Sequence, residues 1–206
     1  EELVNNGLQV IATSSNITKA SQKAWFSKVT YVEFDLSDFN ESVDYYTFFG
    51  RPDILIHLAW EGLPNYIQPF HTEVNLPRHL LLLNNLIENG LKDITVTGTC
   101  LEYGMASGSL AEDRDVLPTT AYAVAKNELR KHLESLSLTN GFSLKWLRLF
   151  YMYGEGQSPK SLFSQLNEAI KNGESVFRMS GGEQVRDFLP IKSVAKIIVK
   201  SALQTE

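Results

Sequence analysis

Cysteine is almost absent from this chain of 206 residues, which contains only Cys100. A single cysteine excludes an intrachain disulfide framework and is typical of a reducing compartment. No apolar run approaches the roughly 20 residues that a membrane-spanning helix needs. The opening residues, EELVNNG, lack the basic start and the apolar core of a signal peptide. These absences predict a soluble, cytoplasmic protein with no membrane partner.

Positive charge is also scarce. The chain has 19 Lys and Arg against 24 Asp and Glu, a net charge of −5, and no basic run. We therefore do not expect nucleic acid as a partner. The four histidines show no ligand spacing, so we expect no metal site. Hydrophobic residues at 43% and charged residues at 21% are typical of an ordinary globular protein.

Short apolar runs alternate with helical patterns up to residue 150. The runs are LQVIAT (8–13), VTYVEF (29–34), DILIHLA (53–59), DITVTG (93–98) and SLKWLRLF (143–150). Such runs are typical of strands buried on both faces of a parallel sheet. Helical patterns fall at 17–27, 41–49, 72–89 and 121–139. The alternation predicts a doubly wound α/β sheet of Rossmann type, with ligands at the carboxyl ends of its strands.

The pattern changes after residue 150. The segment YMYGEGQSP (151–159) is rich in glycine, proline and aromatics and is expected to be a loop, with helices at 160–172 and after Pro190. We expect a dinucleotide-binding domain over residues 1–150 and a substrate-binding region over 151–206. The start, EELVNNG, is typical of a helix tail closed by Gly7. The C-terminal end shows no obvious closure, so we expect both regions to be partial.

The segment TAYAVAKNEL (120–129) places Tyr122 and Lys126 four residues apart on a predicted helix. Residues at this spacing share one helix face. A free tyrosine has a pKa of about 10, and a nearby ammonium favours the phenolate and brings that pKa toward the working range. Taken alone, this common spacing is more typical of an ordinary solvated pair.

A threonine-rich segment, TGTCLEYG (97–104), follows the fourth predicted strand. Thr99 lies beyond the apolar part of that strand, where side chains of a Rossmann-type sheet point into the ligand crevice. Its hydroxyl can bond a substrate carbonyl or hydroxyl. Thr97 lies one side-chain alternation earlier. The alternative, that these threonines are simply strand formers, is adequate for Thr95 and weaker for Thr99.

With these segments in view, the chain resembles the extended short-chain dehydrogenase/reductase family of nucleotide-sugar epimerases, dehydratases and reductases. The segments that carry the resemblance, in order, are DILIHLAW (53–60), EVNLPRHLLLL (73–83), TGTCLEYG (97–104), EDRDVLPTTAYAVAK (112–126), RLFYMYGEG (148–156) and GGEQVRDFLPI (181–191). They cover nearly the whole chain. Together they are far more specific than any one of them alone.

The resemblance implies a catalytic set of Thr99, Tyr122 and Lys126. In it, Tyr122 exchanges a proton with the sugar hydroxyl or ketone, Lys126 lowers the tyrosine pKa and holds the nicotinamide ribose, and Thr99 orients the substrate oxygen. The other cofactor-binding positions that we expect are Ser14, Asp35, Leu36, Leu58, Ala59, Trp60, Asn75, Thr97 and Phe150. Tyr151 and Arg186 join Thr99 as expected substrate-binding residues, with Arg186 on the sugar-nucleotide diphosphate, a bidentate task that suits arginine.

Several departures from the family pattern matter. The family's first strand and its glycine-rich pyrophosphate loop are not found, so we expect this chain to be a fragment that binds dinucleotide poorly as written. Ser14 stands where NAD-preferring members carry an acid, which favours NADP over NAD. Cys100 and Leu101 replace the Asp-Glu of the 4,6-dehydratases, which argues against that activity. Tyr151 and Pro190 replace the usual substrate contacts and leave these contacts open.

The sequence thus predicts an NAD(P)-dependent enzyme that reduces the C4 ketone of a 4-keto-6-deoxy sugar attached to a nucleoside diphosphate. The alternative is a 4-epimerase that uses the same Thr99, Tyr122 and Lys126. A third possibility, a non-catalytic regulator that senses the cofactor, fits poorly because such proteins tend to lose the tyrosine or the lysine. The resemblance also implies a homodimer.

Overall fold

The computed structural model describes residues 1–204. These residues form two compact units. The first comprises Glu1–Leu149 together with the chain from Ile198 onward, and the second comprises Phe150–Ile197. Within the described part of the chain, no helix combines the length and the apolar character needed to cross a membrane.

The strands of the first unit pair in parallel, as the alternation of strands and helices predicts. β1 (Ile11–Ser14) pairs with β2 (Thr30–Glu33). In a second sheet, β4 (Asp93–Thr99) lies between β3 (Leu55–His57) and β5 (Ser143–Leu149). The register pairs Thr99 with Leu149 at the carboxyl end of β4. This end of the central strand is where the predicted site residues begin.

Helices and single turns connect these strands. The α-helices of the first unit are α1 (Glu2–Asn5), α2 (Ile17–Ala20), α3 (Tyr45–Phe48), α4 (Leu76–Glu88) and α5 (Ala121–Asn140). The shorter turns are η1 (Phe26–Lys28), η2 (Leu36–Asp38), η4 (Cys100–Tyr103) and a π-helical turn, η3 (His71–Asn75). The helix predicted over 17–27 is wrong in its length. In α2 only Ala20 is buried, so no apolar stripe supports a longer helix.

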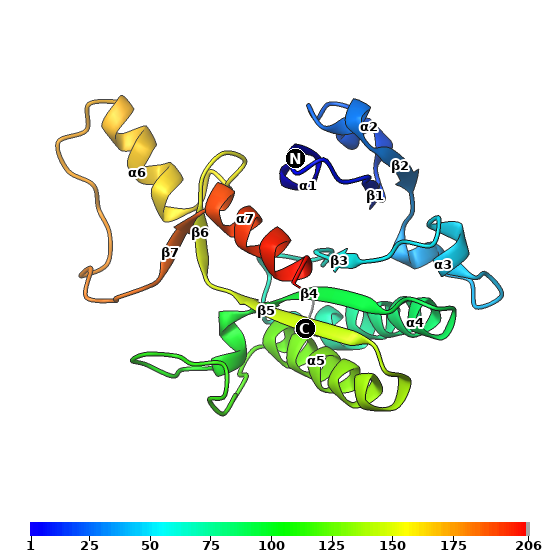
Figure 1. Ribbon diagram of the computed structural model, residues 1–206. Helices are drawn as coiled ribbons and strands as arrows, with labels where there is room; N and C mark the ends of the chain where they lie inside the picture. The colour runs from blue at the N-terminus through cyan, green and yellow to red at the C-terminus, as the bar shows by residue number, and fades with distance from the viewer. Residues whose placement is uncertain (205–206) are drawn as a thin grey trace. The chain divides into compact units, whose positions relative to one another are not determined.

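The core lies where α4 and α5 pack against β4 and β5, and Figure 1 shows the two helices side by side along these strands. Its fully buried members include Leu83 of α4, Leu129 and Leu133 of α5, and Ile94 and Val96 of β4. The helix predicted over 72–89 therefore turns its apolar side toward the core. Helix α5 ends at a left-handed Gly141, as the Asn-Gly signal at 140–141 predicts.

The second unit contains a small parallel sheet that sequence analysis missed. β6 (Tyr151–Tyr153) pairs with β7 (Phe188–Pro190), so the loop predicted over 151–159 is wrong for its first three residues. Local composition could not show this pairing, because the partner strand lies more than 30 residues further along the chain. Helix α6 (Leu162–Lys171) and helix α7 (Ile191–Ala202), which directly follows Pro190, complete the elements.

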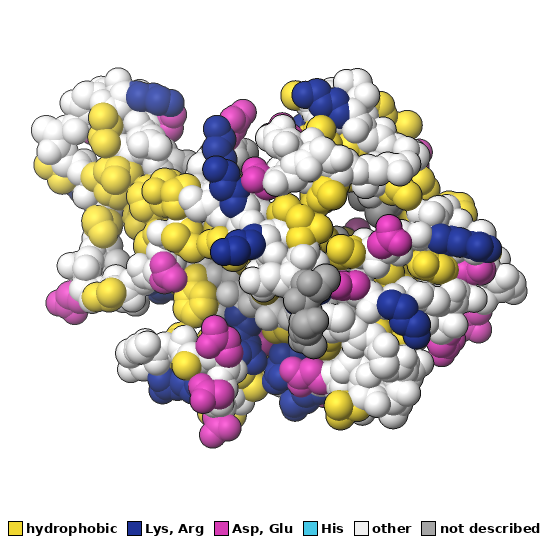
Figure 2. Space-filling model, in the orientation of Figure 1, with side chains coloured by type: hydrophobic (Ala, Val, Ile, Leu, Met, Phe, Trp, Pro, Cys, Tyr) yellow, Lys and Arg dark blue, Asp and Glu magenta, His cyan; other side chains and the backbone are white. Residues whose placement is uncertain are grey.

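Apolar side chains are exposed on and near α6, where Figure 2 shows them in yellow. They include Leu162, Ile170 and Val176. Aromatic rings hold the small sheet, because Phe188 of β7 packs against Tyr151 of β6 and edge-on against Phe163 of α6.

Candidate active site

The first turns of helix α5 carry the predicted tyrosine and lysine. Thr120 caps the helix by accepting a hydrogen bond from the Ala123 N–H. Tyr122 is then in the first turn and Lys126 lies one turn further on. Only 7% of Tyr122 and 1% of Lys126 are exposed. Burial on this scale is unlike an ordinary solvated pair on a helix surface.

The Lys126 ammonium is held by a backbone carbonyl and an aromatic ring. Its Nζ donates a hydrogen bond of 2.8 Å to the carbonyl oxygen of Thr97 on β4 and lies 4.3 Å from the centre of the Trp60 ring. Burial lowers the pKa of Lys126 to about 7, while the Glu102 carboxylate acts in the opposite direction. Lys126 is therefore both fixed in place and close to its titration point at neutral pH.

The Tyr122 phenol shares a hydrogen bond with the side chain of Thr99. Burial raises the pKa of Tyr122 to about 12, the Thr99 bond lowers it, and Tyr66 and Glu102 raise it further. This differs from the expectation that Lys126 lowers the tyrosine pKa. The reason is that desolvation of the phenol dominates, while the ammonium is engaged with Thr97 and Trp60.

A cluster of aromatic rings packs beside these groups. The Trp60 ring stacks on His79 at 4.6 Å with an angle of 7°, and its Nε1 donates to His71 Nδ1 at 3.1 Å. It also meets the Tyr122 ring edge-on at 5.8 Å. Trp60, at the end of the HLAW segment, thus contacts both Tyr122 and Lys126.

Two buried histidines form a pair behind Trp60. His57 Nε2 and His79 Nδ1 are 3.0 Å apart. Burial lowers the pKa of His57 to about 3 and that of His79 to about 2, so both rings are neutral at physiological pH. Across residues 1–204, no group of three or more His, Cys, Asp and Glu side chains is arranged to hold a metal ion.

The structure adds a residue that sequence analysis missed, the buried carboxylate of Glu102. Its Oε1 accepts the Thr99 N–H at 2.8 Å and its Oε2 accepts Arg148 Nε at 2.9 Å. Trp146 Nε1 also donates to it. The signal that could have found it is the Thr-x-x-Glu spacing from Thr99 to Glu102, a capping box around η4.

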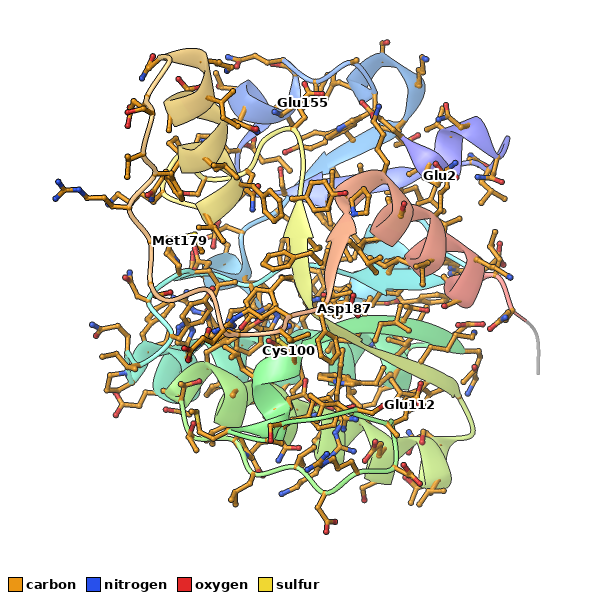
Figure 3. The ribbon with its side chains drawn as sticks, turned by 90° about the vertical axis from the view of Figure 1, so that its left-hand side faces the viewer. Glu2, Cys100, Glu112, Glu155, Met179 and Asp187 are labelled. Atoms are coloured by element: carbon orange, nitrogen blue, oxygen red, sulfur yellow. The ribbon has the colours of Figure 1, made fainter. Side chains whose placement is uncertain are left out.

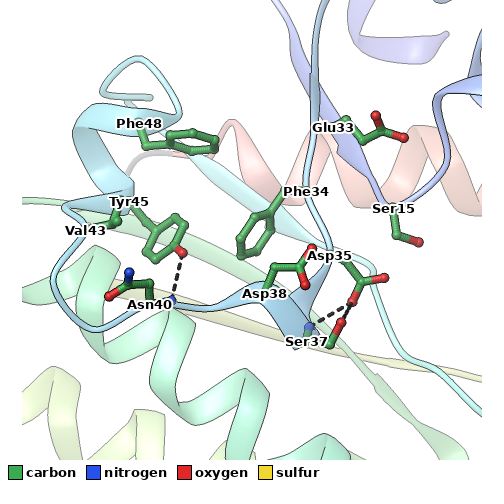
Figure 4. Close-up of a pocket in the computed structure, with 10 residues that line it drawn as sticks. All are labelled: Ser15, Glu33, Phe34, Asp35, Ser37, Asp38, Asn40, Val43, Tyr45 and Phe48. Atoms are coloured by element: carbon green, nitrogen blue, oxygen red, sulfur yellow. Dashed lines mark hydrogen bonds between the residues drawn. The ribbon is translucent and has the colours of Figure 1, made fainter.

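The expected adenine-side positions lie at the carboxyl ends of β1 and β2. Asp35 caps η2 through Ser37, whose hydrogen bonds lower the pKa of the aspartate. Asp35 lines a pocket of about 650 Å³, while Leu36 packs against the core. Figure 4 shows this pocket with the Asp35–Ser37 bonds. Ser14 does not line this pocket, and its hydroxyl lies 2.8 Å from the Tyr31 hydroxyl.

The other expected cofactor positions of the first unit lie near Trp60 and β4. Leu58 and Ala59 follow β3 and are exposed. Asn75 is buried at the end of η3, and its Nδ2 donates to the Glu61 carbonyl oxygen at 2.9 Å. The Thr97 hydroxyl donates to the His57 carbonyl oxygen.

Three predicted residues belong to the second unit. Phe150 is its first residue, and Tyr151 begins β6. The Arg186 guanidinium lies 4.4 Å from the centre of the Tyr151 ring and donates to the Gln184 side chain. The structure therefore brings Tyr151 and Arg186 together within the second unit.

Comparison with known proteins gives this geometry a context. A family model described as the NAD dependent epimerase/dehydratase family matches residues 1–206. A dTDP-6-deoxy-L-talose 4-dehydrogenase (NAD(+)) from Aggregatibacter actinomycetemcomitans is 28% identical over 207 residues, covering 100% of this chain and 75% of that protein. A Bacillus subtilis (strain 168) protein described as an uncharacterized UDP-glucose epimerase, YtcB, is 25% identical over 83% of this chain and 52% of its own length.

Solved structures agree on the fold. MoeE5 in complex with UDP-glucuronic acid and NAD is 25% identical with a TM-score of 0.75, and the match covers 100% of this chain and 67% of that one. A UDP-glucose 4-epimerase from Thermotoga maritima is 23% identical with a TM-score of 0.81, over 99% of this chain and 68% of that one. These likenesses confirm the predicted Rossmann-type α/β class. The chain spans about half the length of YtcB and about two thirds of these solved chains.

Proposed function

The chain belongs to the NAD-dependent epimerase/dehydratase family. On that premise we propose that it carries the active site of a nucleotide-sugar oxidoreductase that reduces a C4 ketone. The family assignment confirms the resemblance to the extended short-chain dehydrogenase/reductases. The observation that carries the proposal is the burial of Tyr122 and Lys126 on helix α5 beside the carboxyl end of β4, where Lys126 Nζ donates to the Thr97 carbonyl oxygen and Thr99 acts on the Tyr122 phenol. These groups are the ones that a carbonyl reduction needs on the protein side.

Each of the three residues has a defined task in this proposal. A bound nicotinamide cofactor supplies the hydride. Tyr122 holds its proton at neutral pH, because burial raises its pKa to about 12, and this suits a proton donor to the forming alkoxide. The Thr99 hydroxyl orients the ketone oxygen toward that phenol. The Lys126 ammonium stabilises the negative charge that develops on the oxygen.

The pocket at the ends of β1 and β2 is the proposed seat of the adenosine half of the cofactor. Phe34 and Phe48 line the pocket with aromatic rings that a base could pack against, and Asp35 offers a carboxylate to a hydroxyl. These residues fit such a group in polarity and in size, since the pocket measures about 650 Å³.

For the choice of cofactor we propose NAD, in place of the NADP that Ser14 favours from the sequence. Glu33, paired with Ser14 in the sheet register, lines the pocket and accepts the Ile17 N–H at 2.9 Å. The Glu33 carboxylate thus already accepts the Ile17 N–H at the start of α2, a hydrogen-bond donor that a 2′-phosphate would otherwise use. With Asp35 and Asp38 also lining the pocket, a 2′-phosphate would meet like charge.

The proposed substrate is a 4-keto-6-deoxy sugar on a nucleoside diphosphate. Support comes from the relative in Aggregatibacter actinomycetemcomitans, whose name describes dehydrogenation at C4 of a dTDP-6-deoxy sugar, the reverse of the proposed reduction. Arg186, which stacks on Tyr151, is proposed to bind the diphosphate. The proposed reduction is tested by incubating the purified protein with a 4-keto sugar nucleotide and NADH, which should give stoichiometric loss of nicotinamide absorbance.

A 4-epimerase is the second candidate, supported by the likeness to YtcB. It would use Thr99, Tyr122 and Lys126 but return the hydride to the opposite face of the sugar. Interconversion of sugar nucleotides without net loss of reduced cofactor would identify it and would refute the reductase.

Replacing Tyr122 with phenylalanine tests the assignment of this site. Loss of the proton donor should lower turnover by about 10²- to 10⁴-fold, while binding of NAD, measured by calorimetry, stays within the range of the unaltered protein. Unchanged turnover would contradict a catalytic role. Binding without turnover in the unaltered protein would instead favour the cofactor-sensing regulator.

Two further predictions concern the assembly and its location. The homodimer that the resemblance implies stays a prediction, and exposed Leu81 on α4 and Leu138 on α5 are candidate contacts for it. Light scattering measures the mass directly. The cytoplasmic location stays a prediction from the sequence, and fractionation of the source cells would test it.

A further inference from the structure

Glu102 is a fully buried carboxylate with a complete set of partners. None of its surface is exposed. One oxygen accepts the Thr99 N–H at 2.8 Å, and Trp146 Nε1 lies 3.1 Å from the same oxygen. The other oxygen accepts Arg148 Nε at 2.9 Å and forms an ion pair with Arg130 Nε at 3.8 Å. The carboxylate thus joins the end of β4 to β5 and to the catalytic helix α5.

Capping a single turn does not require such an arrangement. η4 has only four residues, and a solvated side chain can cap a helix end at little cost. A buried carboxylate carries a desolvation penalty that close, hydrogen-bonded partners must offset. Here the hydrogen-bonded Arg148 offsets it, with a further ion pair to Arg130. The chain also has glycine at position 98, where an added Cβ would collide with Trp146 Nε1 and the Glu102 carboxylate. Residues at several positions of the chain are therefore adapted to hold this one carboxylate.

We propose that Glu102 is a positioning residue for the reaction proposed above: it fixes the backbone of Thr99, and hence the hydroxyl that bonds Tyr122, through its hydrogen bond to the Thr99 N–H and its ion pair with Arg148. The inference rests on the proposed function. Glu102 does not touch the reacting atoms. It acts through Thr99, whose own hydroxyl also accepts the Leu101 N–H and so needs a fixed backbone to keep its direction.

The charge of Glu102 reaches both members of the tyrosine–lysine pair. It raises the pKa of Lys126 against the lowering effect of burial, and it raises the pKa of Tyr122 in the same direction as burial. It therefore favours the protonated form of each group, the state that proton donation to a ketone requires. The titratable groups that act on Tyr122 are Tyr66, Glu102 and Cys100. Glu102 acts on Lys126, and the buried His57 and His79 also interact electrostatically with that ammonium.

Arg148 extends the same network to the segment before α5. Its Nη1 donates to the Tyr103 hydroxyl and to the carbonyl oxygen of Glu112, both at 3.1 Å. Tyr103 in turn donates to the Ala111 carbonyl oxygen. Figure 3 labels Glu112 on this segment. Thr99 and the stretch that leads into the catalytic helix are thus held by one connected set of bonds.

The test compares Glu102→Gln with Asp93→Asn in the purified protein. Asp93 forms an ion pair of 2.8 Å with Lys145 at the other end of the same strands and does not contact Thr99. Glu102→Gln should lower kcat by about 10- to 100-fold, with the KM for the cofactor within about twofold, because misplaced groups slow the chemical step more than binding. Asp93→Asn should change stability alone and leave kcat within about twofold.

A measurement that needs no turnover separates this inference from the proposed function. Tyrosine labelled at the hydroxyl-bearing ring carbon is titrated by NMR, and the Tyr122 signal is identified by its loss in Tyr122→Phe. Removing the Glu102 charge should move the Tyr122 titration to lower pH. If the signal moves but no ketosugar is reduced by the unaltered protein, the proposed function is wrong and the effect of Glu102 on Tyr122 stands.

Other outcomes overturn the inference. An unchanged Tyr122 titration, or an unchanged kcat in a turning-over Glu102→Gln variant, would do so. If Glu102→Gln does not fold, Arg148→Lys keeps the positive charge but loses the bonds to Tyr103 and Glu112. It should lower kcat by about 10-fold and leave the KM for the cofactor within about twofold. Full activity in that variant would likewise overturn the positioning role.

Discussion

Acidification from pH 7 to pH 5 should destabilise this protein through His57 and His79. Both rings are buried and contact each other at 3.0 Å. Burial lowers their pKa values from 6.5 to about 3 and about 2. In this pH range the two rings therefore bind protons in the unfolded chain but not in the folded chain. The stabilising contribution is complete above pH 6.5 and falls as the pH drops toward the folded-state values.

The magnitude follows from the unfolded-state pKa. At pH 5, protonation of one histidine stabilises the unfolded chain by about 2 kcal/mol. The pair should therefore lower the free energy of unfolding by about 4 kcal/mol between pH 7 and pH 5. Since whole domains have roughly 5–15 kcal/mol of stability, this is a large share. Asp35 and Asp44 also have lowered pKa values, but their ordinary pKa of 3.8 places their effect below this range.

Urea unfolding followed by circular dichroism at both pH values measures the effect. A His79→Gln variant serves as the comparison, because it removes one titrating ring and leaves His57. We expect the unaltered protein to lose about 4 kcal/mol and the variant about 2 kcal/mol over the same interval. Comparing the two losses cancels every other titrating group. Equal losses in both proteins would refute the conclusion that the buried pair stays neutral.

Two further predictions concern cofactor choice and packing. Glu33→Gln should raise the ratio of kcat/KM for NADPH to that for NADH by about 10-fold, because one carboxylate of the pocket becomes neutral; steady-state kinetics with both cofactors measure it, and an unchanged ratio would contradict our choice of NAD. Gly98→Ala should cost about 1–3 kcal/mol of unfolding free energy through overpacking against Trp146. Gly181→Ala, where an added Cβ meets only ordinary contacts, should be neutral in the same denaturation experiment, and equal effects of the two changes would argue against the collision.

Much of the fold follows from local sequence patterns. The buried apolar runs mark the strands of the first unit, because a strand covered on both faces needs no polar alternation. Helix α5 matches its prediction to within one residue at its end, since the Thr120 cap and Gly141 are local signals. β6 was missed because the sequence Tyr-Met-Tyr before a glycine has no local feature that separates a strand from a loop. Its strand character comes from pairing with β7.

The candidate site was predictable in its residue types but not in its electrostatics. The spacing of Tyr122 and Lys126 is visible in the sequence, whereas their burial depends on what packs around α5. Glu102 shows the same division. Its capping-box spacing to Thr99 is local, but Trp146 and Arg148 lie 44 and 46 residues further along the chain. Only the folded chain shows that this cap is a buried ion pair.

The glycine at position 98 has a consequence for anyone who wishes to redesign this enzyme. It leaves room for the Glu102 carboxylate, which in turn needs the donors of Trp146 and Arg148. Changes at these four positions should therefore be strongly non-additive, because each alters the space or the hydrogen bonds available to the others. A library that varies them one at a time would miss the combinations in which one change compensates another. Randomising all four positions together is the way to find another set of side chains that packs and hydrogen-bonds at this place.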